Sequence, residues 1–138
     1  MKKEVVSVYV DNKANVLSRV VSLYGRRGFN IDSLTVSATN DPGISRITIV
    51  FEGDNLTLHQ IVAQTEKLEV VRSIKTLDGS KSFFRELLMI KVKADQSKRR
   101  EIKEIVDIFR AKIINLTKEE MVLELTGAPE KLDAFLDL

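Results

Sequence analysis

Apolar residues recur along the chain either every second residue, as in a strand, or about every 3.6 residues, as in a helix. The order in which these two patterns follow one another restricts the fold more than any other feature of the sequence. Over the first 77 residues the pattern predicts strand, helix, strand, strand, helix and strand. The strands are predicted at 4–10, 31–37, 45–51 and 70–77, and the helices at 16–27 and after a cap at Asp54 or Asn55. This βαββαβ order is that of a ferredoxin-like unit, whose two helices cover one face of an antiparallel sheet.

The second predicted strand, residues 31–37, has the features of a sheet edge. It lies at an edge if the sheet order is 4-1-3-2, and it contains no Pro or Lys to block pairing. Leu34 and Val36 are expected to face the core, and Gly28 stands where a helix C-cap favours glycine. We therefore expect a homodimer in which two chains pair through this strand and the first helix, joining their sheets into one.

The second half of the chain starts a new pattern. Residues 78–82 are small and polar, and they place a linker at 78–84 between domains 1–77 and 85–138. Ser97 is expected to cap a helix, and Pro129 to open a last one. Strands are predicted at 87–93, 113–116 and 121–125. The βαββα order indicates a second ferredoxin-like unit without its last strand, and the whole chain is assigned to the α+β class.

The composition excludes several classes of function. Without Cys and with one His, the chain has no disulfide, thiolate nucleophile or Cys-ligated zinc, and we expect no metal site. The net charge is +2 and its signs alternate, which does not indicate a nucleic-acid-binding protein. No apolar run approaches the roughly 18 residues of a membrane span, so we expect a cytoplasmic protein. His59 lies beside the apolar stripe of its helix and is interpreted as a surface side chain.

Three functions known for βαββαβ units lack their signatures here. The strands at 4–10 and 45–51 are aliphatic and lack the stacking aromatics of an RNA-recognition motif. A metallochaperone needs a CxxC loop after the first strand, and the chain has no Cys. An acylphosphatase-like enzyme needs a glycine-rich phosphate cradle with an arginine in that loop, which reads DNKAN at 11–15.

Two polar corners remain as a candidate binding site: the junction of the first strand and first helix, and the corner before the second strand. A helix start offers free N–H groups and a positive dipole end, which suit a carboxylate. Asn12 and Asn30 can form hydrogen bonds with such a ligand, and an apolar wall is available from Val16, Leu17 and Ile31. The combination favours a small amphiphile such as an amino acid.

The residues around these corners resemble the ACT domain of acetolactate (acetohydroxyacid) synthase small subunits. The similar stretches are VLSRV at 16–20, RRGFNIDSLTV at 26–36 and NDPGISRITI at 40–49. The similarity continues with RELLMIKV at 85–92, EIVDIFRAKIINLT at 104–117 and GAPEKLDAFL at 127–136. It therefore covers almost the whole chain.

The resemblance implies a non-catalytic regulatory subunit of the enzyme that opens branched-chain amino-acid synthesis. Such a subunit activates the catalytic large subunit and confers feedback inhibition by valine, which binds between two ACT domains of a homodimer. The resemblance implies no cofactor on this chain. Thiamine diphosphate and magnesium, with FAD as a further candidate, are expected on the catalytic subunit.

The resemblance also implies which residues contact the effector. One chain would contribute Asn12, Asn15, Val16 and Leu17, and the other chain Asn30 and Ile31. Relatives usually carry glycine where this chain has Asn15, and they continue into a final strand beyond position 138. Two other functions stay open: a stand-alone ACT amino-acid sensor that regulates a different enzyme, and a small phosphate-handling enzyme.

Overall fold

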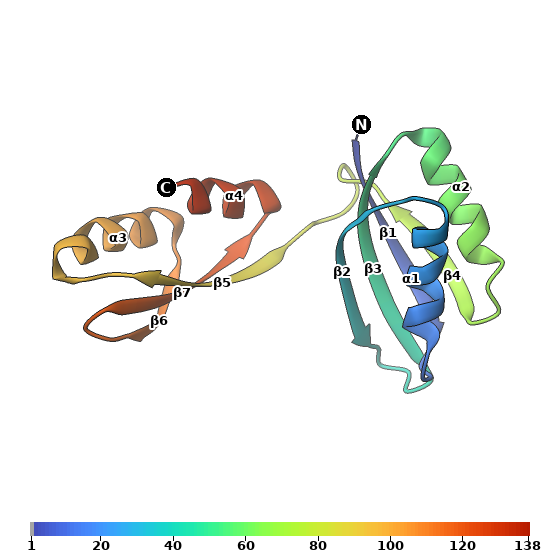
Figure 1. The fold of residues 1–138 in the computed structure, drawn as a ribbon, viewed down its shortest axis with the longest axis horizontal. Helices are drawn as coiled ribbons and strands as arrows, with labels where there is room; N and C mark the ends of the chain where they lie inside the picture. The colour runs from blue at the N-terminus through green and yellow to red at the C-terminus, as the bar shows by residue number, and fades with distance from the viewer. Residues whose placement is uncertain (1) are drawn as a thin grey trace. The chain divides into compact units, whose positions relative to one another are not determined.

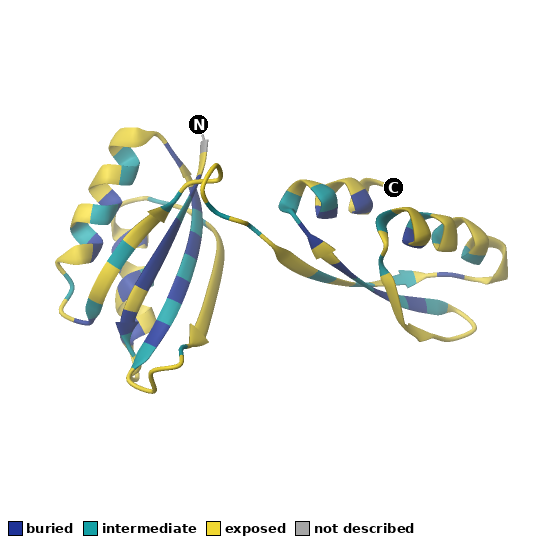
Figure 2. Cartoon of the chain, turned by 180° about the vertical axis from the view of Figure 1, so that it is seen from behind, coloured by how far each residue is buried: buried dark blue, intermediate teal, exposed yellow. Residues whose placement is uncertain are grey.

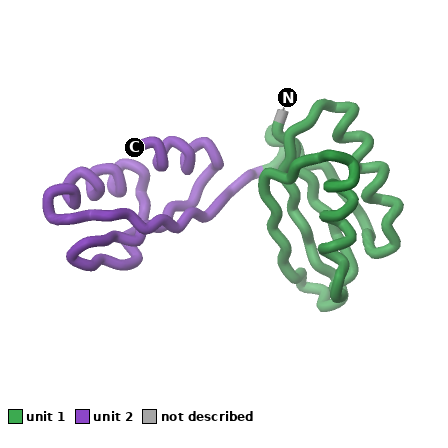
Figure 3. The backbone as a smooth tube through the Cα atoms, in the orientation of Figure 1, with its two compact units in different colours: residues 1–82 green, residues 83–138 purple. Residues whose placement is uncertain are grey.

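Two separate antiparallel sheets form the framework of the protein. The computed structural model describes residues 2–138, and the chain divides into unit 1, residues 1–82, and unit 2, residues 83–138 (Figure 3). The division falls between Ser82 and Phe83, inside the stretch 78–84.

Unit 1 has the predicted βαββαβ order (Figure 1). Its sheet has the order β2-β3-β1-β4, which confirms the predicted 4-1-3-2 arrangement, and every pairing is antiparallel. Both helices lie on one face of this sheet (Figure 1). The elements are β1 (Lys2–Asp11), α1 (Val16–Arg26), β2 (Ile31–Ala38), β3 (Ile44–Gly53), α2 (Asn55–Glu66) and β4 (Val71–Leu77).

The core of unit 1 lies between the central strands and the helices. Val8 of β1 stands opposite Ile47 of β3, and because directly opposed residues share a face, both side chains point toward the helices. Both are buried, as are Tyr24 of α1 and Ile61 of α2. The Tyr24 ring packs edge-on against Phe51 of β3, with 6.1 Å between the ring centroids.

The edge strand β2 departs from the prediction. Leu34 and Val36 were expected to face a core, but they are 37% and 44% exposed. They do point to the helix side, since they stand opposite Ile49 and Ile47. The cover of α1 does not extend over this edge, and Figure 2 shows β2 exposed along most of its length beside the buried central strands. The sheet therefore ends in uncovered apolar side chains.

Unit 2 repeats the order of unit 1 without a last strand. Its sheet has the order β5-β7-β6, again antiparallel. The Phe109 ring of α3 packs edge-on against the Phe135 ring of α4, with 5.3 Å between the ring centroids. Both rings belong to the core that includes the buried residues of β7. The elements are β5 (Glu86–Lys93), α3 (Gln96–Phe109), β6 (Lys112–Leu116), β7 (Glu120–Gly127) and α4 (Pro129–Asp137).

Capping hydrogen bonds and backbone conformation determine where the helices begin and end. Helix α1 ends in a Schellman motif: Gly28 has φ 76°, its N–H donates to the Gly25 carbonyl, and the Phe29 N–H donates to Tyr24. Pro129 is the first residue of α4, as predicted. The prediction that Ser97 caps α3 was wrong.

Asp95 is the N-cap of α3, and its carboxylate accepts hydrogen bonds from the N–H groups of Ser97 at 3.0 Å and Lys98 at 3.2 Å. The helix thus starts at Gln96, and Ser97 and Lys98 are the second and third residues of its first turn, whose N–H groups a capping side chain accepts. The hydrogen bond from the Ser97 hydroxyl, together with these N–H groups, lowers the pKa of the Asp95 carboxyl below its ordinary value.

Replacing Asp95 by Asn should therefore change the acid sensitivity of unit 2. A carboxyl whose pKa is lowered by folding contributes stability that is complete above its unfolded pKa of about 3.9 and is lost as the pH falls through the folded value. The unfolding free energy of the natural chain should fall more steeply below about pH 4 than that of Asp95→Asn, whose amide still caps the helix.

Urea unfolding followed by far-ultraviolet circular dichroism measures this difference. Tyrosine fluorescence reports unit 1 alone, because both tyrosines, Tyr9 and Tyr24, lie there, and its transition should be the same in both chains. Asp107→Asn, at an exposed position later in α3, serves as the control. Parallel pH profiles for the natural chain and Asp95→Asn would contradict the assigned role of the carboxylate.

Candidate functional site

The loop between β1 and α1 is fastened to the turn between β2 and β3. The backbone N–H of Asn12 donates to the Gly43 carbonyl at 2.9 Å, and its side-chain Nδ2 donates to the Pro42 carbonyl at 3.0 Å. Asn12 was predicted to contact a ligand, and its amide nitrogen is already engaged in holding the turn. Its Oδ1 accepts no hydrogen bond within residues 2–138 and stays available as an acceptor.

The other side of the same loop is fastened to β4. The Asp11 N–H donates to the Val70 carbonyl at 2.9 Å, and Arg72 Nε lies 2.8 Å from Asp11 Oδ1. The hydrogen bond and charge of Arg72, with the charge of Lys13, lower the pKa of the Asp11 carboxyl. Contacts to the β2–β3 turn on one side, and to Val70 and Arg72 on the other, thus fix the position at which α1 begins.

Helix α1 begins without a side-chain cap. Its N-cap residue Asn15 has φ 70° and ψ 0°, which lie in the left-handed region. A residue whose side chain caps a helix usually has an extended backbone instead. Within residues 2–138 no protein group accepts a hydrogen bond from the N–H groups of Val16, Leu17 or Ser18. In α2, by contrast, the Asp54 carboxylate accepts from the Thr57 N–H at 2.8 Å. The first turn of α1 therefore offers free donors and a positive dipole end to an anion.

The predicted site residues fall into two groups within one chain. Asn12, Asn15 and Leu17 are exposed around the start of α1, whereas the Val16 side chain is buried in the core, so that only its backbone N–H faces the site. Asn30 is exposed and Ile31 is half-buried at the start of β2.

These two groups are not brought together in a single chain. The start of β2 lies near the other end of α1, and at about 1.5 Å of rise per residue this helix is about 16 Å long. A single chain therefore presents two half-sites.

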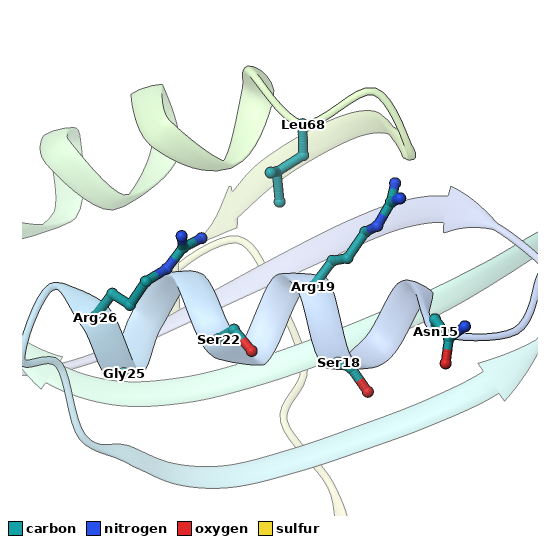
Figure 4. Close-up of a pocket in the computed structure, with 7 residues that line it drawn as sticks. All are labelled: Asn15, Ser18, Arg19, Ser22, Gly25, Arg26 and Leu68. Carbon is teal, nitrogen blue, oxygen red and sulfur yellow. The ribbon is translucent and has the colours of Figure 1, made fainter.

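A shallow groove runs along the solvent side of α1 (Figure 4). In Figure 4, Arg19 and Arg26 extend toward Leu68, while Ser18 and Ser22 point away from it. The two arginines were not among the predicted residues, although their spacing of seven places them on one helix face. The groove shares only Asn15 with the predicted site. Its lining residues are Asn15, Ser18, Arg19, Ser22, Gly25, Arg26 and Leu68.

The described part of the chain offers few other residues for catalysis or metal binding. His59 is exposed, as predicted. Residues 2–138 contain no group of three or more His, Cys, Asp or Glu side chains placed to hold a metal ion. None of the helices described is both long and apolar enough to cross a membrane.

Comparison with known proteins gives consistent matches over both units. Residues 6–73 match the family of AHAS small subunit-like ACT domains, and residues 85–138 match the family described as the small subunit of acetolactate synthase. A probable acetolactate synthase small subunit from Archaeoglobus fulgidus is 44% identical over 99% of this chain and 85% of its own length. The acetolactate synthase small subunit of Mycolicibacterium smegmatis is 47% identical over 95% of this chain and 77% of its own length.

A solved structure agrees with these sequences. The crystal structure of the acetolactate synthase small subunit from Thermotoga maritima superposes with a TM-score of 0.91 at 40% identity, covering 99% of this chain and 86% of that one. Both units are thus ACT-like, ferredoxin-type domains, and the chain belongs to the family of acetolactate synthase small subunits.

Proposed function

We propose that this chain is a non-catalytic regulatory subunit that raises the activity of the acetolactate synthase large subunit and makes it sensitive to valine. Family membership supports the pairing with a large subunit over a stand-alone sensor or a phosphate-handling enzyme. The observation that carries the regulatory part is the uncapped start of α1. Catalysis, with thiamine diphosphate, magnesium and any FAD, is assigned to the large subunit, and the complex to the cytoplasm.

The groups at the start of α1 are complementary to an amino acid. The carboxylate of valine can accept from the N–H groups of Val16 and Leu17, and such charge-assisted bonds contribute about 1.5–3 kcal/mol each. The free Oδ1 of Asn12 is an acceptor for the ammonium group. The exposed Leu17 side chain offers apolar contact to the isopropyl group, whose burial is worth roughly 1.5–3 kcal/mol.

Two-fold pairing of β2 strands would complete the site. Ala38, the last residue of β2, pairs with Ser45 of β3, next to the turn that Asn12 holds. Antiparallel pairing of two β2 strands brings the start of one strand beside the end of the other. Asn30 and Ile31 of a second chain would then approach the start of α1, which is why we assign the two half-sites to different chains.

The first test is an activity measurement. The purified chain alone should form no acetolactate from pyruvate with thiamine diphosphate and magnesium present, and adding it to the large subunit of the same organism should raise turnover. Valine should lower the activity of the complex and leave the large subunit alone unaffected. Acetolactate formation by the isolated chain, or no effect on the large subunit, would exclude the proposed function.

Valine binding tests the role of position 15. The left-handed backbone of Asn15 suits glycine, and a misfit of its side chain costing ~1.4 kcal/mol would weaken binding tenfold. Asn15→Gly should therefore bind valine at least as tightly as the natural chain in calorimetric titration. Asn30→Ala should bind it roughly tenfold more weakly, since one hydrogen bond is lost.

Asn55→Ala, at an exposed asparagine at the start of α2, is the matched control and should bind as the natural chain does. Weaker valine binding by Asn15→Gly would identify the Asn15 side chain as a ligand contact and reverse the steric interpretation.

Dimerisation through β2 is tested at Leu34. A lysine there would put a charge into the apolar edge, so Leu34→Lys should shift the protein from dimer to monomer in analytical ultracentrifugation at micromolar concentration. Leu56→Lys, on an exposed leucine of α2, is the control and should stay dimeric. A monomeric natural chain under the same conditions would refute the two-fold model.

A further inference from the structure

The two units hold the start of their first helix in the same way. Asn12, the first residue after β1, donates its N–H to the carbonyl of Gly43, which is the last residue before β3. Ala94, the first residue after β5, donates its N–H at 2.7 Å to the carbonyl of Glu119, which is the last residue before β7. The start of α3 in unit 2 therefore corresponds to the start of α1 in unit 1.

The ends of these two helices also correspond. Gly28 after α1 and Arg110 after α3 both have a left-handed backbone, with φ 76° and φ 60°. In both units the N–H of the next residue donates to a carbonyl five residues earlier. One residue further on stand Asn30 in unit 1 and Lys112 in unit 2. The amide that we assign to the second half-site of unit 1 thus corresponds to a cation in unit 2.

The two corresponding helix starts differ in what accepts their first N–H groups. At α1, which follows Asn15, these N–H groups find no protein acceptor within residues 2–138. At α3 the backbone of Asp95 is extended, with φ −74° and ψ 176°, and its carboxylate accepts from the N–H groups of Ser97 and Lys98. A carboxylate of the chain itself thus occupies at α3 the kind of position that is open to a free carboxylate at α1.

The surroundings of Asp95 would suit a free anion if this side chain were removed. Two hollows open beside the start of α3, where Asp95 and Ser97 are exposed to solvent. Glu120, on the rim of one hollow, already pairs with Lys91 at 3.6 Å. Apart from Asp95, the charged side chains of the two hollows are four cations and two carboxylates: Lys93, Lys98, Arg99, Lys118, Glu119 and Glu120. Without Asp95, the free N–H groups would therefore lie among more cations than carboxylates.

We propose that Asp95 closes the start of α3 to an effector, so that each chain takes up one amino acid, at the start of α1 alone. The identity of the effector rests on the function proposed above, whereas the closure of α3 rests on the hydrogen bonds of Asp95. Because the Asp95 carboxylate is attached to the chain, it competes for these N–H groups at a high effective concentration and excludes a free carboxylate. The Asp95 side chain thereby determines which of the two similar units responds to the amino acid.

Nuclear magnetic resonance of the backbone amides, with sodium formate as the free carboxylate, tests the closure. In Asp95→Gly the amide signals of Ser97 and Lys98 should shift saturably as formate is added, compared with sodium chloride at equal ionic strength. In the natural chain, and in Asp95→Asn, whose side-chain oxygen still caps the helix, they should move at most about a tenth as far. Glu101→Gly removes an exposed carboxylate within α3 and is the matched control, which should behave as the natural chain does. Equal shifts in the natural chain and Asp95→Gly, or no shift in either, would overturn the proposal.

Calorimetric titration of the natural chain with valine is a second test, and it needs no variant to fold. We expect one valine per chain. Two valines per chain, with shifted amide signals at Ser97 and Lys98, would show that the closure is wrong while the response to valine stands. If formate gives the expected shifts in Asp95→Gly but valine does not bind the natural chain, the valine response proposed above is wrong and the closure of α3 stands.

Discussion

Each unit depends on apolar side chains that oppose one another on neighbouring antiparallel strands and point to the helix side of the sheet. In unit 1, Val8 stands opposite Ile47, and in unit 2, Ile90 stands opposite Leu123. The side-chain period of a strand is two residues, so a slip of one residue would turn each of these side chains to the other face of its sheet. The apolar residues therefore fix the register. The register in turn sets the end of β1 beside the turn at 40–43, where the loop into α1 is held.

This dependence explains which parts of the fold the sequence predicts. Alternation along β1 and β3 and the stripe of α1 are local patterns, and they were sufficient for the element order and the sheet order. The coverage of an edge is not a local property. Leu34 and Val36 alternate as Ile47 and Ile49 do, yet only the latter lie beneath helices. The pattern shows which side of the strand is apolar and gives no information on whether another layer lies above it.

At the candidate site too, local sequence patterns do not determine which individual hydrogen bonds form. The type and position of Asn12 indicated a polar loop, but its bond to Pro42, 30 residues away, depends on the completed sheet. Asp95 and Ser97 are both suitable caps two positions apart, and only the backbone path decides between them. The resemblance places a glycine at position 15 of relatives, and the left-handed backbone of Asn15 is a conformation that glycine adopts readily. Without that resemblance, an asparagine in a loop indicates a turn and nothing more specific.

The separation of the buried residues into two clusters, one in each unit and with no member in common, has an evolutionary consequence. Small cores are marginally stable, and most substitutions consume part of a limited margin. In this chain the buried residues form two clusters, so a substitution in one cluster changes the packing of that cluster and leaves the side-chain packing of the other as it was. Substitutions that repack the core beneath α1 can therefore accumulate without disturbing the packing between α3, α4 and β7.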